Sequence, residues 1–251
     1  VSNVKGGSNH NDARVSMKTI GLISGMSWES TTSYYKLLNE GVKAKLGGLH
    51  SAKIILYSVD FAPIARLQNE GNWEEAALII KEAALSLQRA GADFILLCTN
   101  TMHKILPLVT PFVNIPFLHI AEATATALLT QEKRNAILLG TKFTMQESFY
   151  KDVLNAHKIN VIVPDEKSIE TINHIIFNEL CIGKIETESR RKFLHIIDDL
   201  KKSNERIDSV ILGCTEIGLL LDQRSSNLAL FDTTVLHVNE AIKHALEQET
   251  S

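Results

Sequence analysis

The chain has 251 residues, of which 45% are hydrophobic and 22% charged, and its formal net charge is −3 at pH 7. This length suits two modest domains. A near-neutral chain lacks the basic field that attracts phosphate backbones, which argues against a nucleic-acid partner. No apolar run approaches the roughly 20 residues of a membrane helix, no export signal is evident and cysteines are few, so we expect a cytoplasmic protein without a membrane partner.

Residues 1–16 are polar, rich in Gly, Ser and Asn, and without an apolar period, which predicts a disordered leader. From Met17 on, short apolar runs alternate with longer amphipathic segments. This alternation predicts an α/β fold of parallel sheets with helices on both faces. The expected strands are 19–23, 52–59, 94–97, 136–139, 160–163 and 209–212. The expected helices are 29–45, 73–90, one ending at 129, 145–157, 169–180, 188–202 and 235–247.

A proline-rich stretch offers the one break that resembles a crossing between domains. It contains Pro107, Pro111 and Pro116. We therefore expect lobe 1 to comprise residues 17–115 together with 217–251, and lobe 2 to comprise residues 116–216.

Two of the expected strands end in similar residues. Residues 94–101 have the sequence FILLCTNT, and residues 210–216 have the sequence VILGCTE. Open α/β sheets bind ligands at the carboxyl ends of their strands. The repetition therefore predicts two pseudo-symmetric lobes that face each other across one shared cleft, with the active site in that cleft.

Thiol, hydroxyl, amide and carboxyl side chains gather at these two strand ends. They either cap the following helices or, together with helix N-termini, form a polar pocket suited to a carboxylate. They are Thr99, Asn100, Thr101, Thr215 and Glu216. A helix dipole at the second strand end is expected to favour the thiolate and lower the pKa of Cys214 below about 8.5. Cys181, on the apolar face of a helix, is expected to be structural.

Two βα turns add further candidates. Residues 25–30, GMSWES, lack the glycine spacing of dinucleotide and phosphate loops, which favours a small anion such as an amino-acid carboxylate. Thr141 and Thr144, after the strand 136–139, either bind the ammonium or carboxylate of a substrate or cap their helix.

His103 is expected to orient or polarise a site residue. No Cys or His pair has zinc-ligand spacing, so we expect no metal.

These segments together resemble the cofactor-independent aspartate/glutamate racemase family, especially its bacterial L-aspartate/glutamate-specific members. The resemblance covers residues 17–245 and is carried by GMSWEST (25–31), GGLHSA (47–52), CTNTMHK (98–104), LGT (139–141) with Thr144 and Met145, and GCTEIG (213–218). It implies an isomerase that needs no cofactor, takes an amino-acid substrate and forms a homodimer. It also implies two acid/base residues, on opposite faces of the substrate Cα.

The first acid/base motif departs from the family pattern of Cys-Asn-Thr. If the Asn-Thr pair is aligned, Thr99 takes the acid/base position and Cys98 lies one residue earlier. The internal repeat instead aligns Cys98 with Cys214, and neighbouring strand residues point to opposite faces. We follow the family register and predict the pair Thr99 and Cys214. An alcohol is a poor base, so Cys214 is the expected base and L-enantiomers the expected substrates.

The resemblance assigns further residues to substrate binding: Met26, Ser27, Gln68, Asn100, Thr101, Thr141, Thr144, Thr215 and Glu216. No basic group for a second carboxylate stands out. Arg66 and Gln68 follow the second strand, and Cys181 lies near where a lysine is expected. The choice among aspartate, glutamate and a broader range stays open. Alternative functions are a hydantoin racemase, a decarboxylase or a cis-trans isomerase of the same superfamily, or a non-catalytic protein that binds acidic amino acids.

Overall fold

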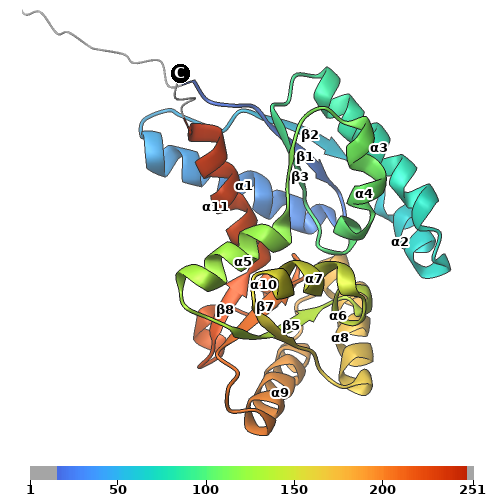
Figure 1. Ribbon diagram of the computed structural model, residues 1–251, viewed down its shortest axis with the longest axis vertical. Coiled ribbons are helices and arrows are strands. Elements are labelled where there is room, and N and C mark those ends of the chain that lie inside the picture. Colours follow the sequence, from blue (N-terminus) through green and yellow to red (C-terminus); the bar gives the residue numbers. More distant parts are fainter. Residues whose placement is uncertain (1–15, 248–251) are drawn as a thin grey trace, which may run out of the picture.

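The computed structural model describes residues 16–247, so the expected leader lies outside the described residues except for Ser16. Within this range the chain forms two four-stranded sheets, and every strand pair in them is parallel. Helices flank both sheets (Figure 1). The predicted α/β class with two lobes is confirmed. None of the helices in residues 16–247 has both the length and the apolar character to cross a membrane.

Lobe 1 is built on a sheet with the strand order β2-β1-β3-β4. Its strands are β1 (Ile20–Ser24), β2 (Ile54–Ser58), β3 (Phe94–Leu97) and β4 (Phe117–Leu118). Its helices are α1 (Trp28–Leu46), α2 (Phe61–Glu70), α3 (Trp73–Arg89) and α4 (Leu106–Val109). Asn72 caps α3 by accepting a hydrogen bond from the backbone N–H of Glu75 at 3.3 Å. The apolar face of α3 then packs against the sheet, because it carries small and branched side chains at helical spacing.

Lobe 2 repeats this topology with the order β6-β5-β7-β8. Its strands are β5 (Asn135–Gly140), β6 (Asn160–Ile162), β7 (Ser209–Gly213) and β8 (Ala229–Asp232). Its helices are α5 (Ile120–Thr130), α6 (Lys142–Gln146), α7 (Ser148–Ala156), α8 (Glu166–Asn178), α9 (Thr187–Ser203) and α10 (Ile217–Leu220). In both lobes a central strand is buried on both faces, which explains why β3 and β7 are almost wholly apolar.

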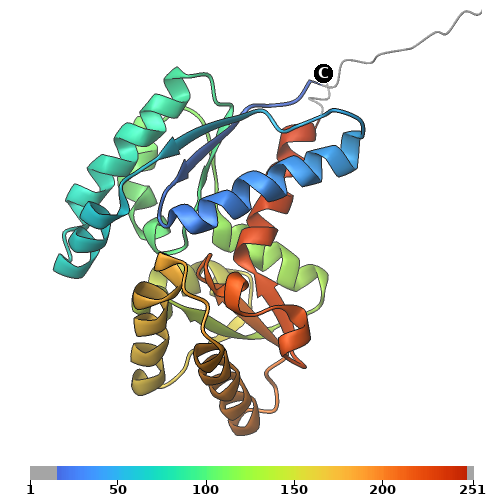
Figure 2. The same cartoon turned by 180° about the vertical axis from the view of Figure 1, so that it is seen from behind.

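The last helix, α11 (Thr233–Leu246), returns to lobe 1. It packs along α1 and α5, and both views show it running from the lower lobe to the upper one (Figure 1, Figure 2). The aliphatic side chains of Val238 and Ile242 belong to the same apolar cluster as Leu38 and Val42 of α1. Burial of this shared face stabilises the connection between the two lobes.

The structure corrects the expected boundaries of the lobes. β4 pairs with β3, so lobe 1 extends beyond residue 115, and β8 pairs with β7, so residues 217–232 belong to lobe 2. Both strands are short, and sequence alternation over two to four residues carries little signal. Two elements also differ from the sequence-based expectation. The helix expected over 145–157 is divided at Glu147, whose backbone is extended. The helix α2 was not expected from the sequence.

Candidate active site

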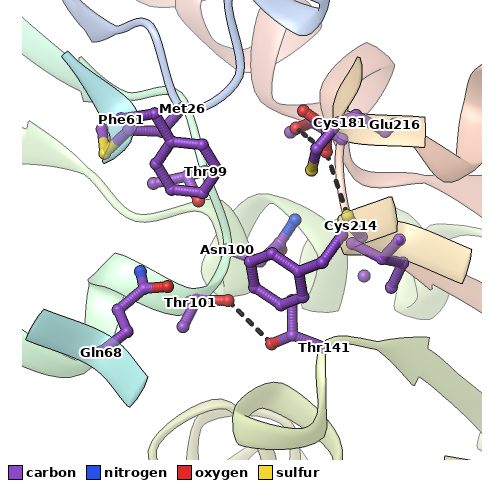
Figure 3. A pocket seen from close by; sticks show the side chains of 14 residues that line it. Met26, Phe61, Gln68, Thr99, Asn100, Thr101, Thr141, Cys181, Cys214 and Glu216 are labelled. Atoms are coloured by element: carbon purple, nitrogen blue, oxygen red, sulfur yellow. Dashed lines mark hydrogen bonds between the residues drawn. The ribbon is translucent and has the colours of Figure 1, made fainter. Parts of the chain in front are cut away.

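The carboxyl ends of the central strands of both sheets meet at one pocket between the lobes (Figure 3). The lining residues come from strand ends, from α2 and from the end of α8. They are Met26, Phe61, Gln68, Thr99, Asn100, Thr101, Thr141, Ile176, Phe177, Cys181, Gly213, Cys214, Thr215 and Glu216. The predicted site residues Ser27 and Thr144 are buried behind this lining and bond to residues in it.

Thr99 and Cys214 approach the pocket from opposite sides (Figure 3). Cys98 does not line it. The Cys98 side chain is buried in the cluster formed by β3, α1 and α11, and its thiol lies 3.7 Å from the carbonyl oxygen of Leu96. Successive side chains of a strand point to opposite faces of the sheet, and the chain keeps this alternation past the end of β3.

The two lobes place Thr99 and Cys214 at equivalent positions. In lobe 1, Leu97 faces the helices that follow the edge strand β2, and in lobe 2, Leu212 faces those that follow β6. Thr99 follows Leu97 by two residues, and Cys214 follows Leu212 by two residues. Each therefore lies on the same face of its sheet as that leucine. The sequence repeat aligns Cys98 with Cys214, whereas the structure aligns the next residue, Thr99, with Cys214.

Glu216 connects the Cys214 thiol to lobe 1. Its Oε2 accepts hydrogen bonds from Cys214 Sγ and from Thr215 Oγ1, both at 3.0 Å. Its Oε1 accepts from the backbone N–H of Ser27 at 3.0 Å and from Ser27 Oγ at 2.8 Å. The carboxylate makes no cap to α10, the alternative considered from sequence. It is a proton acceptor held beside a thiol.

The Cys214 thiol is not an activated thiolate in this arrangement. Burial and the neighbouring Glu216 carboxylate raise the pKa of Cys214 well above its ordinary value. The expectation of a lowered pKa is wrong, because α10 has only four residues, and the backbone hydrogen bond from Glu216, which lowers the pKa of Cys214, is outweighed by burial and by the Glu216 carboxylate. Burial likewise raises the pKa of Cys98.

Hydroxyl groups from both lobes meet on another side of the pocket. Thr101 Oγ1 lies 2.9 Å from Thr141 Oγ1 and 3.4 Å from Thr144 Oγ1. Thr141 Oγ1 also accepts a hydrogen bond from the Thr144 backbone N–H at 3.3 Å, so Thr141 both caps α6 and lines the pocket. The Asn100 amide nitrogen donates to Thr233 Oγ1 at 3.0 Å, across the lobes.

His103 fixes the backbone at Thr99. Its Nδ1 lies 2.8 Å from the Thr99 carbonyl oxygen, and its Nε2 accepts a hydrogen bond from the backbone N–H of Ile120 at 3.2 Å. Since Nε2 is the acceptor, Nδ1 carries the proton and donates it. Burial, with His119 and His237 nearby, lowers the pKa of His103 well below its ordinary value. These two hydrogen bonds hold the backbone at the end of β3 against the start of α5.

Five lining residues were not among the expected site residues, and one of them, Gly213, directly precedes Cys214. Phe61 begins α2 just beyond the edge strand β2, where strand-end reasoning could have found it. Ile176 and Phe177 lie in the last part of α8, and Cys181 in the turn that follows it. Cys181 also packs against the lobe-2 core, as its helix position indicated, whereas the family resemblance set it near an expected lysine. Helix ends far from any strand end give no sequence signal for a pocket.

Aromatic and charged contacts join the lobes around this pocket. The Phe61 and Phe177 rings stack with centroids 6.4 Å apart, and Trp73 packs edge-on against Phe143 at 5.2 Å. Lys104 Nζ lies 2.6 Å from a carboxylate oxygen of Glu147. The enclosed space is about 20 Å³, which holds about one water molecule. No cluster of His, Cys, Asp or Glu within residues 16–247 is placed to hold a metal ion.

The sequence and fold match a known family. A model of the Asp/Glu/hydantoin racemase family matches residues 23–241. The chain belongs to this family. Its resemblance to aspartate/glutamate racemases is thereby confirmed, as is the expectation of an enzyme of the isomerase class and amino-acid racemase type.

Several relatives share most of the chain. A structure from Yersinia pestis assigned as an Asp/Glu racemase is 47% identical, with a TM-score of 0.83, over 92% of this chain and 100% of its own. An aspartate racemase homologue from Pyrococcus horikoshii OT3 is 36% identical, with a TM-score of 0.79, over 92% of this chain and 100% of its own. The broad specificity amino-acid racemase RacX of Bacillus subtilis (strain 168) is 24% identical over 86% of this chain and 92% of its own.

Proposed function

We propose that this family member is a cofactor-independent amino-acid racemase that acts on aspartate, on glutamate or on a broader range of amino acids. The observation that carries the proposal is the position of Thr99 and Cys214, which face one another across a single pocket from equivalent places in the two lobes. Inversion at Cα requires a proton to leave from one face and another to arrive at the opposite face. Two proton-transferring groups on opposite sides supply that geometry.

Cys214 is the base for the L-enantiomer in this proposal. Glu216 accepts the thiol proton along the 3.0 Å hydrogen bond, and the resulting thiolate removes the Cα proton of the substrate. The positive ammonium of the substrate favours this transfer, because a nearby cation stabilises the thiolate. Ser27 supports it by holding the other oxygen of Glu216.

Thr99 serves the opposite face. Its hydroxyl donates a proton to the carbanion formed at Cα and is resupplied by water. An alcohol does not ionise appreciably near pH 7, so the reverse removal of a proton by Thr99 is slow. We therefore propose a preference for L-amino acids.

The polar side of the pocket would hold the α-carboxylate. Asn100, Thr101 and Thr141 present amide and hydroxyl groups there, next to the start of α6. These are the groups that bind small carboxylates in other proteins. Met26 and Thr215 complete the walls on either side of the reacting centre.

The test is exchange of the Cα proton in heavy water, followed by NMR from each enantiomer of Asp, Glu, Asn and Gln. We expect faster exchange from the L-forms. C214S and E216Q should each slow exchange by about 10²–10⁴-fold, because each removes a proton-transferring group. T99C should increase exchange from the D-forms. Faster exchange from D-substrates in the wild type would overturn the assignment of Cys214.

A decarboxylase is a second candidate, favoured by the unequal pair, since one thiol can protonate one face alone. Release of CO₂ from substituted malonates without Cα exchange of amino acids would establish it. Binding of acidic amino acids with neither reaction would identify a non-catalytic binding protein.

We also propose a cytoplasmic homodimer, as the family resemblance implies. α1 offers large exposed aromatic side chains at Trp28 and Tyr35. Sedimentation equilibrium at micromolar concentration measures the mass, and a single species of one chain would contradict the dimer.

A further inference from the structure

Gln68 on α2 and Cys181 after α8 both line the pocket, and we take the part between them as the place for the substrate side chain. Met26, Phe61 and Phe177 contribute apolar groups to the same lining. Aspartate and glutamate carry a second carboxylate, which needs a cation or several donors when it is buried. Within residues 16–247, no lysine, arginine or histidine lines this pocket.

Two basic residues that lie close in the chain to lining residues make their contacts elsewhere. Arg66, one turn before the end of α2, has a side chain that is 70% exposed and pairs with Glu70 at 3.8 Å. Lys104 pairs with Glu147 and lies over the Trp73 ring, with its Nζ 3.9 Å from the ring centroid. Neither residue lines the pocket. Among residues 16–247, no basic side chain therefore lines the pocket to pair with a second carboxylate.

The charge beside Cys181 is negative. Glu216 lines the pocket, and the charges of Glu216 and Glu29 both add to burial in raising the pKa of the Cys181 thiol. A substrate carboxylate placed here would meet two like charges. Its transfer from water would cost free energy with no compensating partner.

Two buried amide oxygens supply acceptors instead. Gln68 donates through Nε2 to Met102 Sδ at 3.1 Å, and Asn100 donates through Nδ2 to Thr233 Oγ1 at 3.0 Å. No donor among the described residues reaches Gln68 Oε1 or Asn100 Oδ1, although the two side chains are only 3% and 2% exposed. Figure 3 shows the Gln68 amide directed toward the pocket. A buried acceptor without a donor indicates a bound donor in the occupied state.

We propose that this site is selective for amino acids with an uncharged carboxamide side chain, so that L-glutamine and L-asparagine are preferred to L-glutamate and L-aspartate. The NH₂ group of the substrate amide donates to Gln68 Oε1, and the apolar walls contact its methylene groups. The inference rests on the proposed racemase function and defines its substrate class.

The experiment compares kcat/KM for Cα exchange between isosteric pairs, Gln with Glu and Asn with Asp. Each pair differs only in charge and in one hydrogen-bonding group. We expect the amide to exceed its acid at least tenfold in both pairs. A site that hydrogen-bonds a donor discriminates strongly against an analogue that lacks it. Equal or faster exchange of the acids would overturn the inference and leave the racemase function standing.

Two variants test the same point with opposite expectations. Q68K places a cation at the place taken for the substrate side chain and should shift the Gln/Glu and Asn/Asp ratios toward the acids by at least tenfold. R66Q, two residues earlier on α2, is the matched control and should leave both ratios unchanged. If R66Q removes activity on the acids instead, Arg66 is the carboxylate ligand and the inference is wrong.

Calorimetric binding of the same four amino acids to C214S, which keeps the charge of Glu216, separates the two proposals. Tighter binding of the amides without exchange by the wild type would retain the inference and reject the racemase function. Tighter binding of the acids rejects the inference alone, and absence of both binding and exchange rejects both.

Discussion

Residue 98 shows how one position in a strand decides the role of a thiol. Cys98 and Thr99 are neighbours, yet Cys98 is buried against α1 and α11 and Thr99 lines the pocket. A cysteine surrounded by apolar side chains behaves as a small hydrophobic residue. Chemical type alone therefore does not assign a residue to this site; the face of the strand does.

Replacement of Cys98 tests this assignment directly. C98A should keep the rate of Cα exchange within about threefold of wild type. It should lower the free energy of unfolding by about 1–2 kcal/mol, because it removes a buried sulfur from a packed cluster. Exchange rates and urea unfolding measure the two effects separately. A loss of exchange as large as that in C214S would refute the predicted register.

At the scale of elements, glycine allows the ends of β5 and β7 to lie close together. A Cβ atom at Gly213 would lie 2.8 Å from the carbonyl oxygen of Leu139 on the neighbouring strand. Gly140 has the same constraint, because its Cβ would lie 2.7 Å from the carbonyl oxygen of Gly213. The close approach lets the residues that follow these glycines, Thr141 and Cys214, both line the pocket.

We predict that G213A loses both stability and activity. The added methyl group must displace backbone, which costs about 1–3 kcal/mol. The shift moves Cys214 away from Glu216, so exchange should fall at least tenfold at a temperature where the variant is folded. Melting temperature and exchange rate are the two measurements. G213A with wild-type exchange would show that the strand-end geometry is not required.

For the whole molecule, the lobes must separate before an amino acid can enter. The pocket encloses about 20 Å³, whereas sites for small ligands usually enclose several hundred Å³. The pair Lys104 and Glu147 joins lobe 1 to lobe 2 and is partly buried. The stacked Phe61 and Phe177 rings do the same beside the pocket. The described conformation is therefore the closed one.

K104M should shift the molecule toward an open arrangement. A partly buried ion pair contributes on the order of 1 kcal/mol, so KM should change by about fivefold and the radius of gyration of the ligand-free protein should rise. K36M, which removes an exposed pair with Glu40 on α1, is the control and should change neither quantity. Identical scattering and KM in the two variants would argue against this role of Lys104.

The buried histidines predict a loss of stability in acid. His237 bonds to the Tyr34 hydroxyl at 2.8 Å and to the Leu118 carbonyl oxygen at 2.7 Å, and burial lowers its pKa to about 4. Between pH 6.5 and 4 the unfolded chain binds a proton at this residue and the folded chain does not. The stability present above pH 6.5 is therefore lost as the pH falls toward 4, by on the order of 3 kcal/mol.

Urea unfolding at pH 7 and pH 5 measures this effect. H237Q should flatten the pH dependence, and H195Q should not, because the His195 side chain is 76% exposed. A wild-type free energy of unfolding that is constant between these pH values would contradict the prediction.

The sequence predicted most strands and helices because their patterns are local. Runs such as 94–97 and 210–212 are apolar throughout, since sheets covered on both faces demand it. The expected site residues mostly line one pocket for a related reason: parallel strands bring their carboxyl ends to a common edge. β4 escaped prediction because two residues carry no period, and β8 because it is a half-buried edge strand without the continuous burial of β3. The lobe boundaries moved with both strands.

The sequence by itself determined the two α/β lobes, the shared cleft and the cysteine at its second strand end. Only the tertiary structure decided that Glu216 and burial keep the Cys214 thiol protonated, and that Phe177 and Cys181 close the pocket. It also placed Arg66 and Lys104 outside the pocket. Periodicity and motifs are properties of neighbouring residues, whereas burial, charge and pocket lining depend on segments that meet only when the two lobes come together.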